Sequence, residues 1–188
     1  MAAKEIGKIE AVCVSRTKGT AKQNIGQAIL KEDYGMQGDA HAGSGHRQVS
    51  LLSAEKIKEF QKTEPEIRYG SFGENLVVSG IDPALLPIGT RLRCGTVLLE
   101  ITQIGKECHS GCTIARRTGT CIMPANGVFA CVLTEGTIRT GDCFEVVSNK
   151  EFHTSKGFRV CWPKVKVSNR RYGGRPMGMC RKADAFRI

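Results

Sequence analysis

Short apolar runs separated by glycine turns are the feature that most limits how this chain can fold. The 22 glycines fall largely between these runs, where tight turns are needed. Glu135-Gly136 and Thr140-Gly141-Asp142 are two such turn signals near the end of the apolar segments. The runs themselves have the alternation or the β-forming composition of strands: Ile6–Val14, Asn75–Val78, Gly127–Leu133 and Cys143–Val147.

Residues 90–102 predict a β-hairpin that turns at Gly95. Arg91 and Arg93 fall on one face of its first strand, and Leu92 falls on the other, because side chains alternate along a strand. A solvated strand face is the simplest account of the two arginines. Contact with an anionic ligand is the alternative.

A short helix is predicted after Ser53, which can cap its amino end. Ala54, Ile57 and Phe60 repeat at a three-residue spacing, and Pro65 limits the continuation. Many short strands with one or two short helices favour a mainly β, barrel-like domain over a doubly wound sheet.

The net charge of +10 is unevenly distributed along the 188 residues. Residues 1–147 hold 17 basic and 16 acidic side chains, whereas residues 148–188 hold 11 basic and 2 acidic ones. We therefore expect one β-barrel domain over 1–147 and a C-terminal basic extension over 148–188 that is disordered or loosely docked. The alternatives for this extension are a nucleic-acid-binding arm, the one place where we expect any contact with nucleic acid, and a sequence foreign to the domain.

Nine cysteines, an odd number, and an amino terminus without an apolar signal core argue against a disulfide framework. No apolar stretch reaches the roughly 18 residues that span a bilayer, so we expect a cytoplasmic protein without membrane contact. The cysteines that fall in predicted strands are expected to be buried as small apolar residues: Cys13, Cys94, Cys131 and Cys143.

The first polar cluster lies at 38–47, directly before the apolar residues 49–52. Gly38 allows the backbone to approach a ligand closely, while His41 and Arg47 supply donors for anionic oxygens. An anion or cofactor pocket follows, with Asp39 as part of the same wall. The alternative is an ordinary glycine loop in which Asp39 and His41 hydrogen-bond locally.

The second cluster lies at 105–112 and contains Cys108. Lys106 and His109 flank this cysteine and would lower its pKa, which matters because the thiolate is the nucleophile and the metal ligand. Cys112 and Cys121 could resolve a persulfide, complete a zinc site with Cys108 and His109, or be buried. The spacing lacks the paired CxxC arms of zinc ribbons, which argues against zinc.

These clusters, with several other segments in the same order, resemble the MOSC family, named after the C-terminal domain of molybdenum cofactor sulfurase. The resemblance covers about residues 8–147. Its segments are Gly38–Gly43, Arg47–Leu52, Phe72–Leu76, Leu86–Gly89, Leu92, Ile104–His109, Gly127–Ala130 and Gly141-Asp142.

The resemblance implies a β-barrel fold and binding of the molybdenum cofactor (molybdopterin), or sulfur transfer toward it. It also implies one important cysteine, which falls on Cys108, as persulfide carrier or molybdenum ligand. A molybdopterin carries a phosphate and a dithiolene, so its pocket needs fixed donors and cations. We expect these from Gly38, Asp39, His41, Arg47, Lys106 and His109, with Arg91 or Arg93 at the phosphate.

The partners expected from the resemblance are a sulfur donor and a cofactor acceptor. A body of 147 residues is too short for a pyridoxal-phosphate fold, so a separate pyridoxal-phosphate cysteine desulfurase would supply the sulfur. A molybdoenzyme or a cofactor-biosynthesis protein would receive the product. Two other functions stay open: a cofactor-binding chaperone without transfer, and a zinc-stabilised domain whose tail binds RNA.

Overall fold

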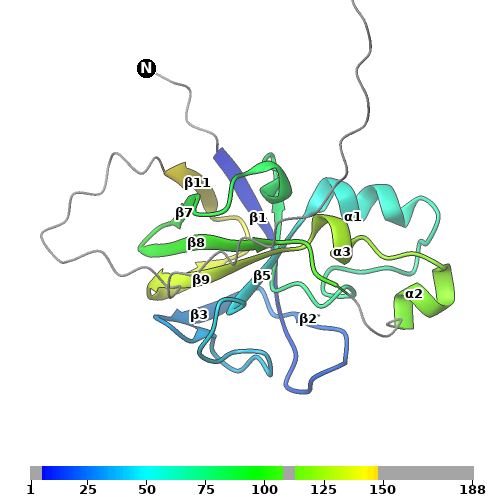
Figure 1. Ribbon diagram of the computed structural model, residues 1–188, viewed down its shortest axis with the longest axis horizontal. Coiled ribbons are helices and arrows are strands. Elements are labelled where there is room, and N and C mark those ends of the chain that lie inside the picture. The colour runs from blue at the N-terminus through cyan, green and yellow to red at the C-terminus, as the bar shows by residue number, and fades with distance from the viewer. Residues whose placement is uncertain (1–5, 108–112, 148–188) are drawn as a thin grey trace, which may run out of the picture.

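The structure, a computed structural model, describes residues 6–107 and 113–147 of the chain (Figure 1). Cys108, His109, Cys112 and the predicted extension at 148–188 lie outside the described residues. Within the described part no helix is long and apolar enough to cross a membrane.

Seven strands form a closed β-barrel, as the sequence predicts. They follow one another in the order β1, β11, β7, β8, β9, β5, β6, and β6 pairs with β1 to close the ring. Only the β5–β6 pair is parallel among the described pairings. The barrel strands are β1 (Ile6–Val14), β5 (Val49–Ser53), β6 (Leu76–Ser79), β7 (Arg91–Cys94), β8 (Val97–Ile104), β9 (Val128–Thr134) and β11 (Cys143–Val147).

Four further strands lie beside the barrel. β2 (Gln23–Asn24) pairs with the end of β1, while β3 (Gln27–Lys31), β4 (Gly35–Met36) and β10 (Gly136–Arg139) form a small antiparallel sheet. The pairing of β10 with β3 corrects the sequence analysis, which treated Gly136 as part of a turn. A strand of four residues whose partner lies more than a hundred positions earlier leaves little local signal.

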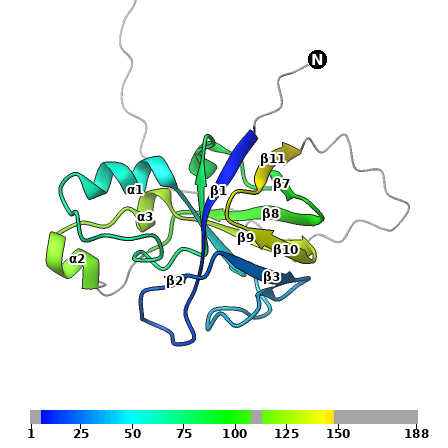
Figure 2. The ribbon, with the colours of Figure 1, turned by 180° about the vertical axis from the view of Figure 1, so that it is seen from behind.

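The helices gather at one end of the barrel, as the two opposite views agree (Figures 1 and 2). α1 begins after Ser53, whose hydroxyl accepts a hydrogen bond from the Lys56 amide, as predicted. Two more short helices lie at the same end as α1. A 3-10 turn connects β6 to β7. The bounds are α1 (Ala54–Gln61), α2 (Thr113–Thr118), α3 (Met123–Asn126) and η1 (Pro83–Leu85).

Two apolar cores hold this arrangement together. One fills the barrel and includes Leu51, Leu99 and Val132. The other lies between the barrel wall and the helices and includes Ile57 of α1 and Phe129 of β9. The helical end is thus fixed against the outer face of β5 and β9, the strands beside which the candidate site lies.

The cysteines in strands follow the sequence prediction with one exception. Cys13, Cys94 and Cys131 are buried, but Cys143 is exposed. Cys143 is the first residue of β11, where its neighbour Phe144 takes the inward direction. Cys121 is partly buried and packs against the second core.

Candidate functional site

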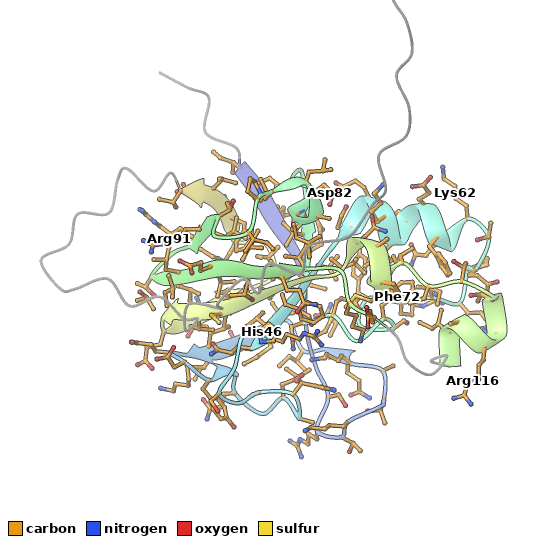
Figure 3. The ribbon with its side chains drawn as sticks, in the orientation of Figure 1. His46, Lys62, Phe72, Asp82, Arg91 and Arg116 are labelled. Atoms are coloured by element: carbon orange, nitrogen blue, oxygen red, sulfur yellow. The ribbon has the colours of Figure 1, made fainter. Side chains whose placement is uncertain are left out.

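A cleft of about 710 Å³ opens beside the helical end of the barrel. Phe72 lies there, near α3 in the side-chain view (Figure 3). The apolar side chains that line the cleft are Ile67, Phe72, Ile114, Met123 and Phe129. The basic ones are Lys18, Lys22, His41, Arg47, Lys106 and Arg117, against a single acid, Glu66, among the described residues.

This combination of an apolar lining with an excess of positive charge suits an anionic ligand that has a flat or apolar body. Arg117 is partly neutralised, because its guanidinium forms ion pairs with Glu66 at 3.0 Å and Glu64 at 3.7 Å. Lys22 is neutralised in the same way by the buried Asp39 at 2.6 Å. Lys18, Arg47 and Lys106, from three separate segments of the chain, supply the remaining positive charge. The fold, not a local motif, therefore creates the positive cleft.

Asp39 of the first polar cluster is buried beneath the cleft rather than in it. Its Oδ2 accepts hydrogen bonds from Lys22 Nζ at 2.6 Å, Asn75 Nδ2 at 3.1 Å and the Ser15 amide at 3.2 Å. Burial alone would raise the pKa of Asp39, but Lys22 and the amides of His41 and Ser15 hold it below its ordinary value. Asp39 thus ties together four chain segments as a buried carboxylate.

Lys22 is the partner that the sequence analysis missed. Its side chain is 2% exposed, and burial lowers its pKa, an effect that Asp39 opposes. A lysine in the polar stretch between β1 and β2 has the sequence signature of an exposed residue. Its burial depends on contacts with Gly70 and Asp39, which are distant in sequence.

The turn at 70–73 forms another wall of the cleft. Gly70 has a φ of +94°, and a Cβ there would overlap the carbonyl oxygen of Lys22, so glycine is required on two grounds. The fully buried Glu74 holds this turn by accepting hydrogen bonds from the amides of Gly70 at 2.6 Å and Phe72 at 3.0 Å. Burial raises the pKa of Glu74 to about 7.

Asn75 connects the turn to the barrel. Its Oδ1 accepts hydrogen bonds from the amide and the hydroxyl of Ser50, while its Nδ2 donates to the Cys13 carbonyl and to Asp39. Ser50 and Asn75 both line the cleft. The sequence analysis gave neither Glu74 nor Asn75 a role at the site, and the structure identifies them as the supports of this wall.

Arg47 is held in a fixed orientation at the cleft. Its guanidinium carbon lies 5.2 Å from the centre of the Phe129 ring, and its Nε donates to Gln103 Oε1 at 2.9 Å. The same Gln103 oxygen lies 3.0 Å from His46 Nε2. Gln103 binds Nε and Phe129 covers one face of the guanidinium. The terminal amino groups of Arg47 can then donate to an anionic ligand.

The segment that leads to Cys108 is also fixed at the cleft. Gly105 packs against α3, where a Cβ would come within 2.5 Å of the Pro124 carbonyl oxygen, and the Lys106 amide donates to that oxygen at 3.2 Å. Lys106 lines the cleft, as does Ile114 on the far side of the undescribed segment.

The structure brings His41, Arg47 and Lys106 to one cleft, whereas Gly38, Asp39, Arg91 and Arg93 do not line it. Gly38, with φ of +83°, lines a separate cleft of about 670 Å³. Arg91 on β7 is 7% exposed and pairs with Glu100 at 3.2 Å. Figure 3 shows it at the end of the barrel away from Phe72.

Arg93 follows on the same strand, in register with Glu145 of β11, and likewise does not line the cleft. The ladder between β7 and β8 places Arg91 directly opposite Glu100, so a structural ion pair accounts for it. The placement of both arginines therefore gives no support to a phosphate contact.

No group of three or more histidine, cysteine or acidic side chains able to hold a metal occurs within residues 6–107 and 113–147. The candidate zinc ligands Cys108, His109 and Cys112 lie outside those ranges.

Comparison with known proteins identifies the family. The MOSC domain matches residues 38–145, more than half of the chain, which therefore belongs to this family. A sequence search against curated proteins gives no match.

Three solved structures share the fold. YuaD from Bacillus subtilis is 22% identical with a TM-score of 0.65, over 78% of this chain and 98% of its own. YiiM from Geobacillus stearothermophilus is 18% identical with a TM-score of 0.58, over 76% and 75%. YiiM from Escherichia coli is 20% identical with a TM-score of 0.53, over 76% and 70%.

Proposed function

We propose that this protein binds the molybdenum cofactor in the positive cleft and transfers sulfur to it, with Cys108 as the sulfur carrier. The observation that carries the proposal is the convergence of Arg47, Lys106 and Lys18 on a cleft with an apolar lining. The MOSC family is itself named after the cofactor sulfurase domain, which favours this ligand among anionic ones.

The described residues suit the chemistry of a pterin that carries a phosphate. Arg47, oriented by Gln103 and Phe129, supplies paired donors that match a phosphate. Lys106 and Lys18 add positive charge without a fixed geometry. Phe72 and Met123 offer apolar contact to the flat pterin ring.

Chain connectivity supports a role for Cys108. This residue follows Lys106 by two positions, so the Cα atoms of the two residues are at most about 7.6 Å apart in any conformation. A soft sulfur donor within that reach of the cleft suits a molybdenum centre. The thiolate would accept sulfur from a persulfide of a cysteine desulfurase, which releases the donor as a thiol.

Intact mass after incubation with a cysteine desulfurase and cysteine tests the transfer. We expect wild-type protein to gain the mass of one sulfur atom, reversibly by reductant, and Cys108→Ala to gain none. Cys143→Ala, which removes an exposed thiol on β11, is the matched control and should behave as wild type.

The other outcomes separate the alternatives. No adduct on wild type would contradict transfer and favour a cofactor-binding module in which Cys108 is a ligand only. An adduct retained by Cys108→Ala would move the carrier role to Cys112 or Cys121.

A further inference from the structure

Asp39 contacts His41 twice, through its backbone and through its ring. The His41 amide donates to Asp39 Oδ1 at 2.8 Å, which fixes the position of the histidine relative to the carboxylate. The ring Nδ1 lies 3.4 Å from the same oxygen. The backbone hydrogen bond thus holds His41 beside Asp39, and the imidazole Nδ1 faces the same carboxylate oxygen.

The carboxylate itself cannot turn away from the ring. Its second oxygen is occupied by Lys22 Nζ at 2.6 Å, by Asn75 Nδ2 and by the Ser15 amide. The side chains of Lys22 and Asp39 are each 2% exposed, so the pair is shielded from water. An ionised, fixed acceptor consequently faces His41 Nδ1.

A carboxylate at this position selects one tautomer of the neutral imidazole. Nδ1 carries the proton toward Asp39, so Nε2, at the opposite side of the ring, presents a lone pair. The His41 side chain is 46% exposed and lines the cleft, which gives Nε2 access to a bound group.

We propose that His41 is the proton acceptor of this cleft, with Asp39 and Lys22 as positioning residues that set its tautomer. This inference rests on the proposed function, which supplies the sulfur substrate. His41 would carry out the proton transfer that sulfur chemistry in the cleft requires.

Burial and the neighbouring lysines favour the neutral form of His41. Partial burial and the positive charges of Lys22 and Lys18 lower its pKa, and Asp39 opposes that change. A neutral imidazole with a lowered pKa is unprotonated at Nε2 and ready to accept.

The step is a simple proton transfer without redox change. The S–H bond of a thiol or hydropersulfide held in the cleft breaks, its electron pair stays on sulfur, and the proton forms an N–H bond at Nε2. The resulting imidazolium keeps its Nδ1–H on Asp39 and later returns the proton to solvent. The sulfur becomes the anionic form that acts as nucleophile.

Nitrogen-15 NMR of the histidine rings at pH 7 tests the tautomer, with His41→Gln to assign the signals. We expect His41 protonated on Nδ1 and unprotonated on Nε2 in wild type. In Asp39→Asn this preference should be lost, while Asp142→Asn, a carboxylate outside the cleft, should leave it unchanged. A wild-type ring that is protonated on Nε2 would overturn the inference, whether or not Asp39→Asn folds.

The rate of sulfur uptake between pH 5.5 and 8.5 tests the role. We expect His41→Gln to lower the maximal rate about 100-fold and to remove one ionisation from the pH profile. An unchanged rate and profile in His41→Gln would overturn the inference. A wild type that takes up no sulfur would instead contradict the proposed function. The NMR measurement of the His41 tautomer would then be the only test of the present inference.

Discussion

The Lys22 ammonium lies 2.6 Å from Asp39 Oδ2, and both side chains are almost completely buried. A buried ion pair adds little to the free energy of unfolding compared with apolar residues of the same size. Removing one partner, however, leaves an uncompensated buried charge. Asp39 also accepts hydrogen bonds from the backbone amides of Ser15 and His41. The ionised carboxylate therefore joins the segment that follows β1 to the loop that carries His41.

Loss of either partner should be strongly destabilising. We expect Lys22→Met to lower the free energy of unfolding by about 3–5 kcal/mol, measured by urea denaturation. Lys31→Met removes an exposed ion pair with Glu135, with the two side chains 47% and 55% exposed, and should cost less than about 1 kcal/mol. Equal losses in the two variants would contradict the role assigned to the buried pair.

Glu74 should make stability fall as the pH rises. Its folded pKa of about 7 lies above the ordinary value of 4.5, so the folded state binds the proton more tightly. The contribution is fully present below about pH 4.5 and is lost as the pH rises through 7, in total roughly 3 kcal/mol. Glu74→Gln should flatten the difference in unfolding free energy between pH 5 and pH 8.

The comparison of wild type with Glu74→Gln isolates this group from others, such as His41, whose lowered pKa acts in the opposite direction. Parallel pH profiles for the two proteins would show that Glu74 does not titrate in this range. The variant is expected to be less stable at pH 5, since a carboxamide cannot accept hydrogen bonds from both turn amides with its two terminal atoms.

Gly70 and Gly19 form a matched pair for the cleft wall. Both have positive φ, +94° and +79°, but a Cβ would meet the Lys22 backbone only at Gly70 and would find open space at Gly19. Gly19→Ala should therefore cost about 1–2 kcal/mol from backbone strain alone, whereas Gly70→Ala should cost at least about 2 kcal/mol more. Thermal or urea unfolding that ranks the two equally would contradict the close packing.

Gln103 should control anion affinity through Arg47 without contacting the anion. Gln103→Glu places a carboxylate beside the Arg47 Nε, which competes with a ligand for the same guanidinium. We expect phosphate binding, measured by calorimetry, to weaken about tenfold or more. The variant should also be less stable, because Gln103 Nε2 donates to the Gly105 carbonyl at 2.7 Å and a carboxylate oxygen there cannot donate. Gln27→Glu, beside Arg139 on the small sheet, is the control and should leave phosphate affinity unchanged.

Local patterns in the sequence predicted much of the barrel. The alternation over Ile6–Val14 and the turn at Gly95 identified β1 and the β7–β8 hairpin, and Ser53 marked the start of α1. These signals are local, so they are present in the sequence itself. The short β10 is recognisable only through its pairing with β3, and it was missed.

The candidate site was predicted only in part, because its contacts are non-local. His41, Arg47 and Lys106 were identified from two polar clusters, and the structure places all three at one cleft. Lys22 was missed because its burial comes from distant partners. Arg91 or Arg93 was expected at the phosphate, with a solvated strand face as the alternative, because the ion pair of Arg91 with Glu100 on the neighbouring strand is not visible in the sequence.

The most direct test of the central claim is titration of molybdopterin into wild type, Arg47→Ala and Arg139→Ala, with binding measured from the change in pterin fluorescence. Arg139 is an exposed arginine on β10 that does not line the cleft. We predict that Arg47→Ala weakens binding by about 10- to 100-fold, as expected for a charged hydrogen bond worth 1.5–3 kcal/mol, while Arg139→Ala binds as wild type. Absence of binding to wild type, or equal affinity in all three proteins, would contradict the assignment of this cleft to the cofactor.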